Sequence, residues 1–194
     1  MWISHRNTRS LAVRAACTVV LVCSAASPMI AQVRVDNGRH TRWQRFGRDM
    51  GYGIAEGLAF AGLDQALKQP KDWDSGGTGF GKRAASDVGE FVIQESVTEG
   101  LAAALNRPLD YTRCGCRSTG SRVGHALALS VVDQMPDGHH ALAIPRIVGA
   151  FAGSFAQASW RPGPSSDRTR VALGNAATSL AIGAGINLFH EFVK

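Results

Sequence analysis

The feature that most constrains the fold is an uncharged C-terminal stretch, VALGNAATSLAIGAGINLFHEFV, at positions 171–193. It has no Asp, Glu, Lys or Arg between Arg170 and Glu191. Drawn as a helix, the stretch shows two roughly opposite apolar stripes: Val171, Ile182, Ile186, Phe189 and Val193 on one side, and Leu173, Leu180, Ala184 and Leu188 on the other. A helix that is apolar all round is either the core of a bundle or a membrane span.

The length and composition of this stretch decide between the two. Residues 171–189 are nineteen uncharged positions, about enough for a tilted membrane crossing. Seven are strongly apolar and together favour insertion by about 2–4 kcal/mol, but the Asn, Ser, Thr, Gly and Ala residues between them contribute little or oppose it. The total free energy of membrane insertion is therefore near zero. The sequence therefore favours a helix sheltered on all sides by its own protein, with a membrane-embedded helix as the alternative.

Residues 1–31 have the pattern of a signal peptide. Three arginines precede the apolar run 15–26, which is followed by small residues. Cleavage is expected after Ala26 or after Ala31. We therefore expect an exported protein, periplasmic or associated with the envelope, in which residues 32–194 form a single helical domain.

Net charge limits the classes of binding partner, and the cysteine count limits the possible disulfides. Without residues 1–31 the chain keeps 18 basic and 15 acidic residues, a net charge of +3, which does not indicate a nucleic-acid partner. Two cysteines remain, Cys114 and Cys116. In an exported chain they can form one disulfide at most. Ordinary structural cysteines, a disulfide and a metal site remain, in that order, as interpretations.

Periodicity and capping signals predict four further helices, separated by loops rich in Gly, Pro and Asp. Their expected ranges are 41–69, 86–106, 119–134 and 144–160, with long loops at 71–83 and 107–118. The first helix is rich in glycine, and small residues recur four apart at Gly149/Gly153 and at Ala181/Gly185. Such spacing lets helices approach closely in lipid or in water. The predicted fold is an all-α compact bundle of about five helices with the C-terminal helix central.

One loop imitates a nucleotide-binding motif. Gly76-x-x-x-x-Gly81-Lys82 matches most of a phosphate-binding loop, but Arg83 stands where the motif needs a magnesium-binding hydroxyl. The preceding residues are polar and do not form the required strand. No nucleotide is expected to bind, and no cofactor is predicted.

Acidic and histidine residues were considered as metal ligands. Glu95 and Glu99 lie one helical turn apart and could act as an acid pair or as ligands. Metal-binding bundles of this kind use Glu-x-x-His pairs, which the chain lacks. His125 falls among apolar residues and is interpreted as a core histidine. A second grouping fits no metal-site spacing; it consists of Asp133, Asp137, His139 and His140.

Several loop motifs carry a resemblance. They are Ala61-Gly-Leu-Asp-Gln-Ala66, Pro70, Trp73-x-x-Gly-x-x-Gly-Phe-Gly-Lys-Arg83, Glu99, Tyr111-x-Arg113, Arg122, Asp137-Gly138, Trp160-x-Pro162 and Glu191-Phe192. In this order they resemble a family of uncharacterised bacterial exported proteins, rich in Gly and Ala, with no known activity. The resemblance implies a glycine-rich helical exported protein.

The resemblance also directs attention to polar and aromatic positions near helix ends. With Glu95 added, these are Trp73, Arg83, Glu95, Glu99, Tyr111, Arg113 and Arg122. In a structural account, the arginines cap helix C-termini and pair with glutamates. In a functional account, all seven form one ligand-facing cluster.

The function expected from the sequence is that of a non-catalytic envelope protein. It would act through helix packing and surface contacts, at a membrane surface or against another envelope protein, and it could form oligomers. One alternative is an integral or pore-like membrane protein built on closely packed helices. The other is a metal-binding protein or enzyme that uses Glu95, Glu99 and histidines.

Overall fold

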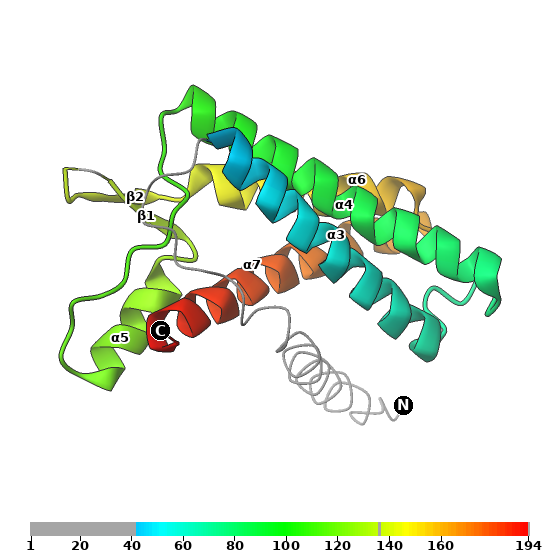
Figure 1. Ribbon diagram of the computed structural model, residues 1–194. Helices are drawn as coiled ribbons and strands as arrows, with labels where there is room; N and C mark the ends of the chain where they lie inside the picture. The colour runs from blue at the N-terminus through cyan, green and yellow to red at the C-terminus, as the bar shows by residue number, and fades with distance from the viewer. Residues whose placement is uncertain (1–41, 136, 194) are drawn as a thin grey trace, which may run out of the picture. The chain divides into compact units, whose positions relative to one another are not determined.

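The computed structural model describes residues 42–135 and 137–193 (Figure 1). All of them belong to one compact unit, His40–Lys194. The elements in chain order are α3 (Arg42–Leu67), α4 (Gly77–Ala104), α5 (Thr119–Ala128), β1 (Val132–Gln134), β2 (His140–Leu142), α6 (Ile144–Trp160), the 3₁₀ turn η1 (Ser165–Asp167) and α7 (Arg168–Phe192). The predicted signal peptide and its cleavage positions lie outside the described residues.

The predicted all-α bundle is confirmed, with five helices in the part of the chain that the structure describes. Helix α4 packs against α3 on one side and α6 on another; α6 also packs against α7, and α7 against α5. The two short strands form a small hairpin between α5 and α6.

Helix α4 begins nine residues earlier than predicted. The loop predicted at 71–83 is therefore wrong for residues 77–83, which are helical. The Asp74 carboxylate accepts the backbone N–H of Gly76 at 2.7 Å and that of Gly79 at 3.1 Å, which supports the first turn of the helix. A Cβ atom at Gly79 would overlap the Asp74 carbonyl oxygen. The glycines that suggested a loop instead let the chain turn tightly into a helix.

The helix predicted at 119–134 is also too long, because α5 ends at Ala128 and a hairpin follows. Val132 pairs with Leu142 and Gln134 with His140 in an antiparallel ladder. The N–H of Gly138, which has φ +87°, donates to the Met135 carbonyl at 2.9 Å. The sequence predicted only a loop between residues 134 and 144, and it did not predict the two strands.

Small residues line the helix interfaces. Of the nine buried hydrophobic residues among those described, eight are alanine and the ninth is Leu129. A Cβ at Gly149 would overlap the Thr98 side chain, and a Cβ at Gly153 would lie 2.8 Å from the Glu90 carbonyl oxygen. The close approach of α6 to α4 therefore requires glycine at both positions.

The expectation that the C-terminal helix is sheltered on all sides is wrong. In α7 the buried residues are Ala172, Ala176 and Glu191, and only 11% of its most apolar 18-residue window is buried. The segment Ser165–Phe192 is long and apolar enough, by length and composition, to cross a membrane. Its neighbours α5 and α6 leave much of its surface uncovered.

Candidate functional site

The seven candidate residues do not form one cluster. Trp73 and Arg83 lie at the connection of α3 to α4, whereas Tyr111, Arg113 and Arg122 lie near the C-terminal end of α7. Arg83 and Glu99 are sixteen residues apart on one helix, which separates them by about 24 Å. A single ligand-facing site made by all seven is therefore not present.

Arg83 is buried and holds the turn between α3 and α4 through hydrogen bonds. Its guanidinium is fully buried and hydrogen-bonded to acceptors that all come from the end of α3 and the turn after it. These acceptors are the carbonyl oxygens of Gln69, Pro70, Trp73 and Asp74 and the side-chain oxygen of Gln65. The basic residue at the end of the false nucleotide motif thus pairs with buried carbonyl groups of the turn that follows α3.

Glu191 is the centre of the polar group at the end of α7. Its side chain is buried; one oxygen accepts from the Tyr111 hydroxyl at 2.7 Å and from the Cys114 N–H at 3.0 Å. The other oxygen accepts from Arg122 Nε at 2.8 Å. Arg113 donates to the Val193 carbonyl at 2.6 Å. These contacts fasten the end of α7 to α5 and to the loop before it.

The hydrogen bonds also set the charge state of this group. Burial alone would raise the pKa of Glu191, but donation from Arg122, from the Cys114 N–H and from Tyr111 outweighs burial and lowers the pKa to about 2. Burial and the bond to Glu191 raise the pKa of the Tyr111 phenol. A carboxylate that stays ionised in this way holds structure together and is unsuited to proton transfer near neutral pH.

The two cysteines of the same loop, Cys114 and Cys116, are joined by a disulfide. The nearby His125 is half-buried, and its Nε2 lies 2.8 Å from the Thr112 carbonyl oxygen. The His125 contact joins this loop to α5, and the disulfide lies within the loop.

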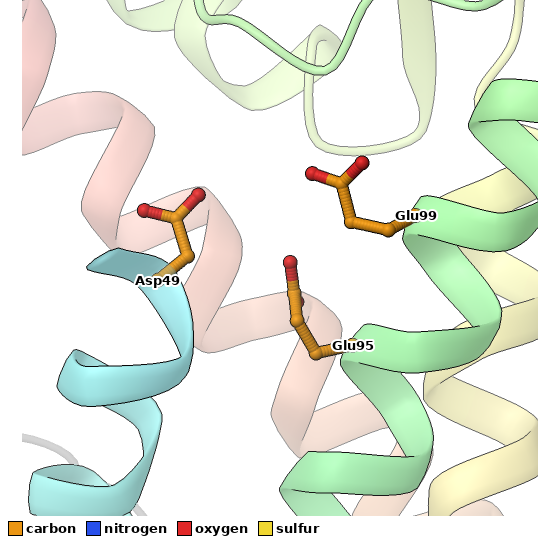
Figure 2. Close-up of side chains that lie close together, drawn as sticks. All are labelled: Asp49, Glu95 and Glu99. Atoms are coloured by element: carbon orange, nitrogen blue, oxygen red, sulfur yellow. The ribbon is translucent and has the colours of Figure 1, made fainter. Parts of the chain in front are cut away.

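Asp49, Glu95 and Glu99 form an acidic group between α3 and α4 (Figure 2). One carboxylate oxygen of each lies within 4.8 Å of the others, and Figure 2 shows the three side chains directed toward a common space. Burial, together with the charges of Asp49 and Glu99, raises the pKa of Glu95 to about 7, against the opposing charge of Arg146. Asp49 escaped sequence analysis because only the packing of α3 on α4 brings it to the glutamates.

The chemistry of this group is that of crowded negative charge. Carboxylate oxygens suit hard cations such as calcium, magnesium or manganese, and the group contains no histidine of the kind found in di-metal bundles. A proton on Glu95 relieves the same repulsion without any ligand. The geometry alone therefore does not identify a metal centre.

The grouping of Asp133 and Asp137 with two histidines does not come together as a site. Asp133 is buried and lies 3.4 Å from Arg146, whereas Asp137 pairs with His139 at the exposed turn of the hairpin. The two carboxylates thus serve different partners.

A line of polar side chains runs through the interior where α4, α6 and α7 meet. Its hydrogen bonds join Ser154 to Glu90, Gln157 to Asp87, Asn175 to Gln157, and Ser179 to Gln94. Burial, with the charges of Asp64 and Glu90, raises the pKa of Asp87 to about 7 against the charge of Arg161. The interior of the bundle is therefore formed by small and polar side chains. The sequence did not predict a polar interior.

The outward face of α6 is apolar and continuous. Ile144, Val148, Phe151 and Phe155 recur at helical spacing and are 37–43% exposed, and we call them the α6 strip. The rings of Phe151 and Phe155 stack with centroids 6.4 Å apart. Helix α6 thus buries its small and polar face and exposes its large apolar one, which is the reverse of a helix on the surface of a water-soluble bundle.

The one charged residue of α6 turns away from this strip. Arg146 donates to the carbonyl oxygens of Leu129 at 2.7 Å and of Leu109 at 2.9 Å, and it is paired with the buried Asp133. The α6 strip is consequently free of charge along its whole length.

No protein-family model matches the chain, and no significant match was found among curated proteins or solved structures.

Proposed function

We propose that this protein is an exported, non-catalytic envelope protein that associates peripherally with a membrane surface through the α6 strip. The observation that carries the proposal is the reversed polarity of α6, whose small and polar face is buried while its aromatic and aliphatic face is exposed. Contiguous apolar surface of this kind marks a contact with lipid or protein.

The surface composition favours lipid over water as the neighbour of this face. Small residues at helix contacts, interhelical polar hydrogen bonds and large apolar residues on the outside are the features of helices packed in an apolar surrounding. Helix α7 also exposes large apolar residues, among them Val171, Leu173 and Ile186, on more than one of its sides. The signal-peptide pattern at residues 1–31 supports export to an envelope compartment.

Length favours α6 lying on the membrane over crossing it; α7 is long enough to cross, and it is the basis of the integral alternative that the carbonate wash tests. The uncharged part of α6 after Arg146 has fourteen residues, residues 147–160, which rise about 21 Å, short of the roughly 30 Å of a hydrocarbon core. The partner helix α4 carries six charged residues, Lys82, Arg83, Asp87, Glu90, Glu95 and Glu99. A strip that lies in the plane of the interface needs neither length nor an uncharged neighbour.

The expected membrane affinity of the α6 strip is modest. Complete burial of a large apolar side chain contributes about 1.5–3 kcal/mol, so removing the exposed part of the four strip residues from water contributes about 2–5 kcal/mol in total. That is the strength of a reversible anchor, which usually acts together with a second attraction.

Fractionation of bacterial cells tests the proposal. The chain is expected in the membrane fraction at physiological salt and in the supernatant after a carbonate wash. The double variant Phe151→Ser/Phe155→Ser should move to the soluble fraction, whereas Ile54→Ser/Leu58→Ser, on the exposed face of α3, should not.

Two results would replace the proposal. Retention of the chain through the carbonate wash would make it an integral membrane protein. Recovery of the unmodified chain in the soluble fraction would remove the membrane role altogether. Metal analysis of the purified chain with and without Glu99→Ala addresses the remaining alternative, because metal bound by the unmodified chain and lost in the variant would assign a metal-binding role.

A further inference from the structure

The α6 strip ends beside a pair of arginines at the start of α7. We infer that Arg168 and Arg170 bind the phosphate headgroups of anionic lipids while the α6 strip contacts the acyl boundary. This inference rests on the proposed membrane role and adds the class of lipid that the surface selects.

The two surfaces are continuous. A shallow hollow where α6 meets α7 is lined by Phe155, Ala158, Ser159, Arg168 and Thr169. The last aromatic residue of the strip and the first arginine of α7 therefore face the same solvent space. An apolar contact and a headgroup contact can be made there at the same time.

The charges of these arginines are available to a ligand. Arg168 and Arg170 are exposed, and within the described ranges no carboxylate forms an ion pair with either. Other arginines are engaged inside the protein: Arg45 with Asp110, Arg122 with Glu191, and Arg161 with Asp64. Asp167, next to the pair, reduces the local charge without cancelling it.

The position of the pair opposes helix stability. The first turn of α7 contains two arginines and no acidic residue, and the N-cap Asp167 makes no capping hydrogen bond, although the positive end of the helix dipole favours acidic residues. Phosphate groups of an anionic surface beside this turn would be attracted by Arg168, by Arg170 and by the helix dipole, so such a surface turns an unfavourable arrangement into a favourable one.

The match to a lipid surface follows from geometry and charge together. The interface of an anionic bilayer presents phosphates next to apolar chains, and the strip presents the Phe155 ring next to Arg168, with Arg170 exposed two residues further along α7. Each basic residue near such a surface contributes about 1 kcal/mol, which is about fivefold in binding. Two arginines, partly offset by Asp167, give about tenfold.

Vesicle sedimentation with the chain purified after export from a bacterial host tests the inference. One set of vesicles is phosphatidylcholine, and the other is phosphatidylcholine with one quarter phosphatidylglycerol. Binding to the anionic vesicles should be about tenfold tighter and should lose this advantage at high salt. The variant Arg168→Gln/Arg170→Gln should bind both vesicle types equally, while the matched control Arg117→Gln, an exposed loop arginine, should keep the preference.

The outcomes separate this inference from the proposed function. If Arg168→Gln/Arg170→Gln keeps the tenfold preference, the arginines are not the headgroup contact, although the membrane role stands. If Phe151→Ser/Phe155→Ser loses binding to both vesicle types, the strip is the common anchor. If the unmodified chain binds neither vesicle type, both the inference and the proposed function are wrong; a dimer in solution that Phe151→Ser/Phe155→Ser dissociates would then assign the strip to a second copy of the chain.

Discussion

Two glutamates of this bundle have opposite electrostatic environments. Glu191 is surrounded by donors from Arg122, Tyr111 and the Cys114 backbone, whereas Glu95 is crowded by other carboxylates. The pKa of the first is lowered to about 2 and that of the second is raised to about 7. Replacing each by glutamine should therefore change stability in opposite directions.

Glu95→Gln should stabilise the protein at pH 8. Because the folded-state pKa of Glu95 is above its ordinary value of 4.5, its contribution to stability is complete below pH 4.5 and is lost as pH rises through about 7. The variant avoids this loss and should gain about 1–3 kcal/mol in free energy of unfolding at pH 8. Urea denaturation at pH 4 and pH 8 measures the difference, which should be small at pH 4. A variant that is less stable than the unmodified protein at both pH values would contradict the electrostatic crowding of Glu95.

Glu191→Gln should destabilise the protein at pH 7 by about 1–3 kcal/mol, because charge-assisted hydrogen bonds from Arg122 and the Cys114 N–H are weakened. The folded pKa of Glu191 is below 4.5, so its stabilisation is present above that pH and is lost as pH falls toward 2. The loss should therefore shrink on acidification. An unchanged melting midpoint at pH 7 would show that these bonds add little.

At this scale the sequence could indicate which residues are unusual but not what they contact. Arg83 and Arg122 stood out from their motifs, yet Glu191 is sixty-nine residues from Arg122 and Asp49 belongs to another helix than Glu95. Such pairings depend on how helices cross. Spacing within one helix carries no information about them.

Among the helices, those with strong periodicity and clear boundaries were predicted best. Helix α6, with Pro145 in its first turn, matches its predicted range 144–160, and α7 differs from its prediction only at the ends. The errors fell where glycine and aspartate support a helix start at α4, and where a two-stranded hairpin follows α5. In both places the turn-forming residues were identified correctly. Whether they begin a helix or connect two strands depends on tertiary contacts, which the sequence does not show.

The burial of α7 was the largest error at the scale of elements, and it leads to a prediction. No atom lies within 4 Å of a Cβ built at Gly183, so a larger residue there would not overpack a core. Gly183→Ala should instead stabilise α7 by up to about 1 kcal/mol through helix propensity.

Gly149→Ala is the matched contrast in α6. Its Cβ would overlap Thr98, so the protein should lose about 1–3 kcal/mol despite the same gain in propensity. Thermal denaturation of both variants compares an open glycine with a glycine in a helix contact. Equal shifts of the two melting midpoints would mean that the α4–α6 contact is looser than described.

For the whole molecule, the outward placement of large apolar residues predicts a small heat capacity change on unfolding. Ordinary globular proteins show about 12–15 cal/mol/K per residue because unfolding exposes a large apolar core. Here the interior is mostly alanine and polar side chains, while twenty-one large hydrophobic residues are already exposed among the residues described. Calorimetry should give a value clearly below that range, and mild detergent should raise the melting temperature by covering the outer face. A value within the range would mean that the exposed residues are covered in solution.

The alanine-rich faces of α4, α6 and α7 have a further consequence for the register of the bundle. Alanine against alanine packs almost equally well if one helix slides by a turn, about 5.4 Å, so such faces alone do not select one alignment. The pairs Ser154–Glu90 and Ser179–Gln94 exist in only one alignment, and a slide would leave the buried Ser154 and its half-buried counterparts without these hydrogen bonds. These hydrogen-bonded pairs therefore fix which turn of each helix faces its neighbour. They also fix which side of α6 remains exposed.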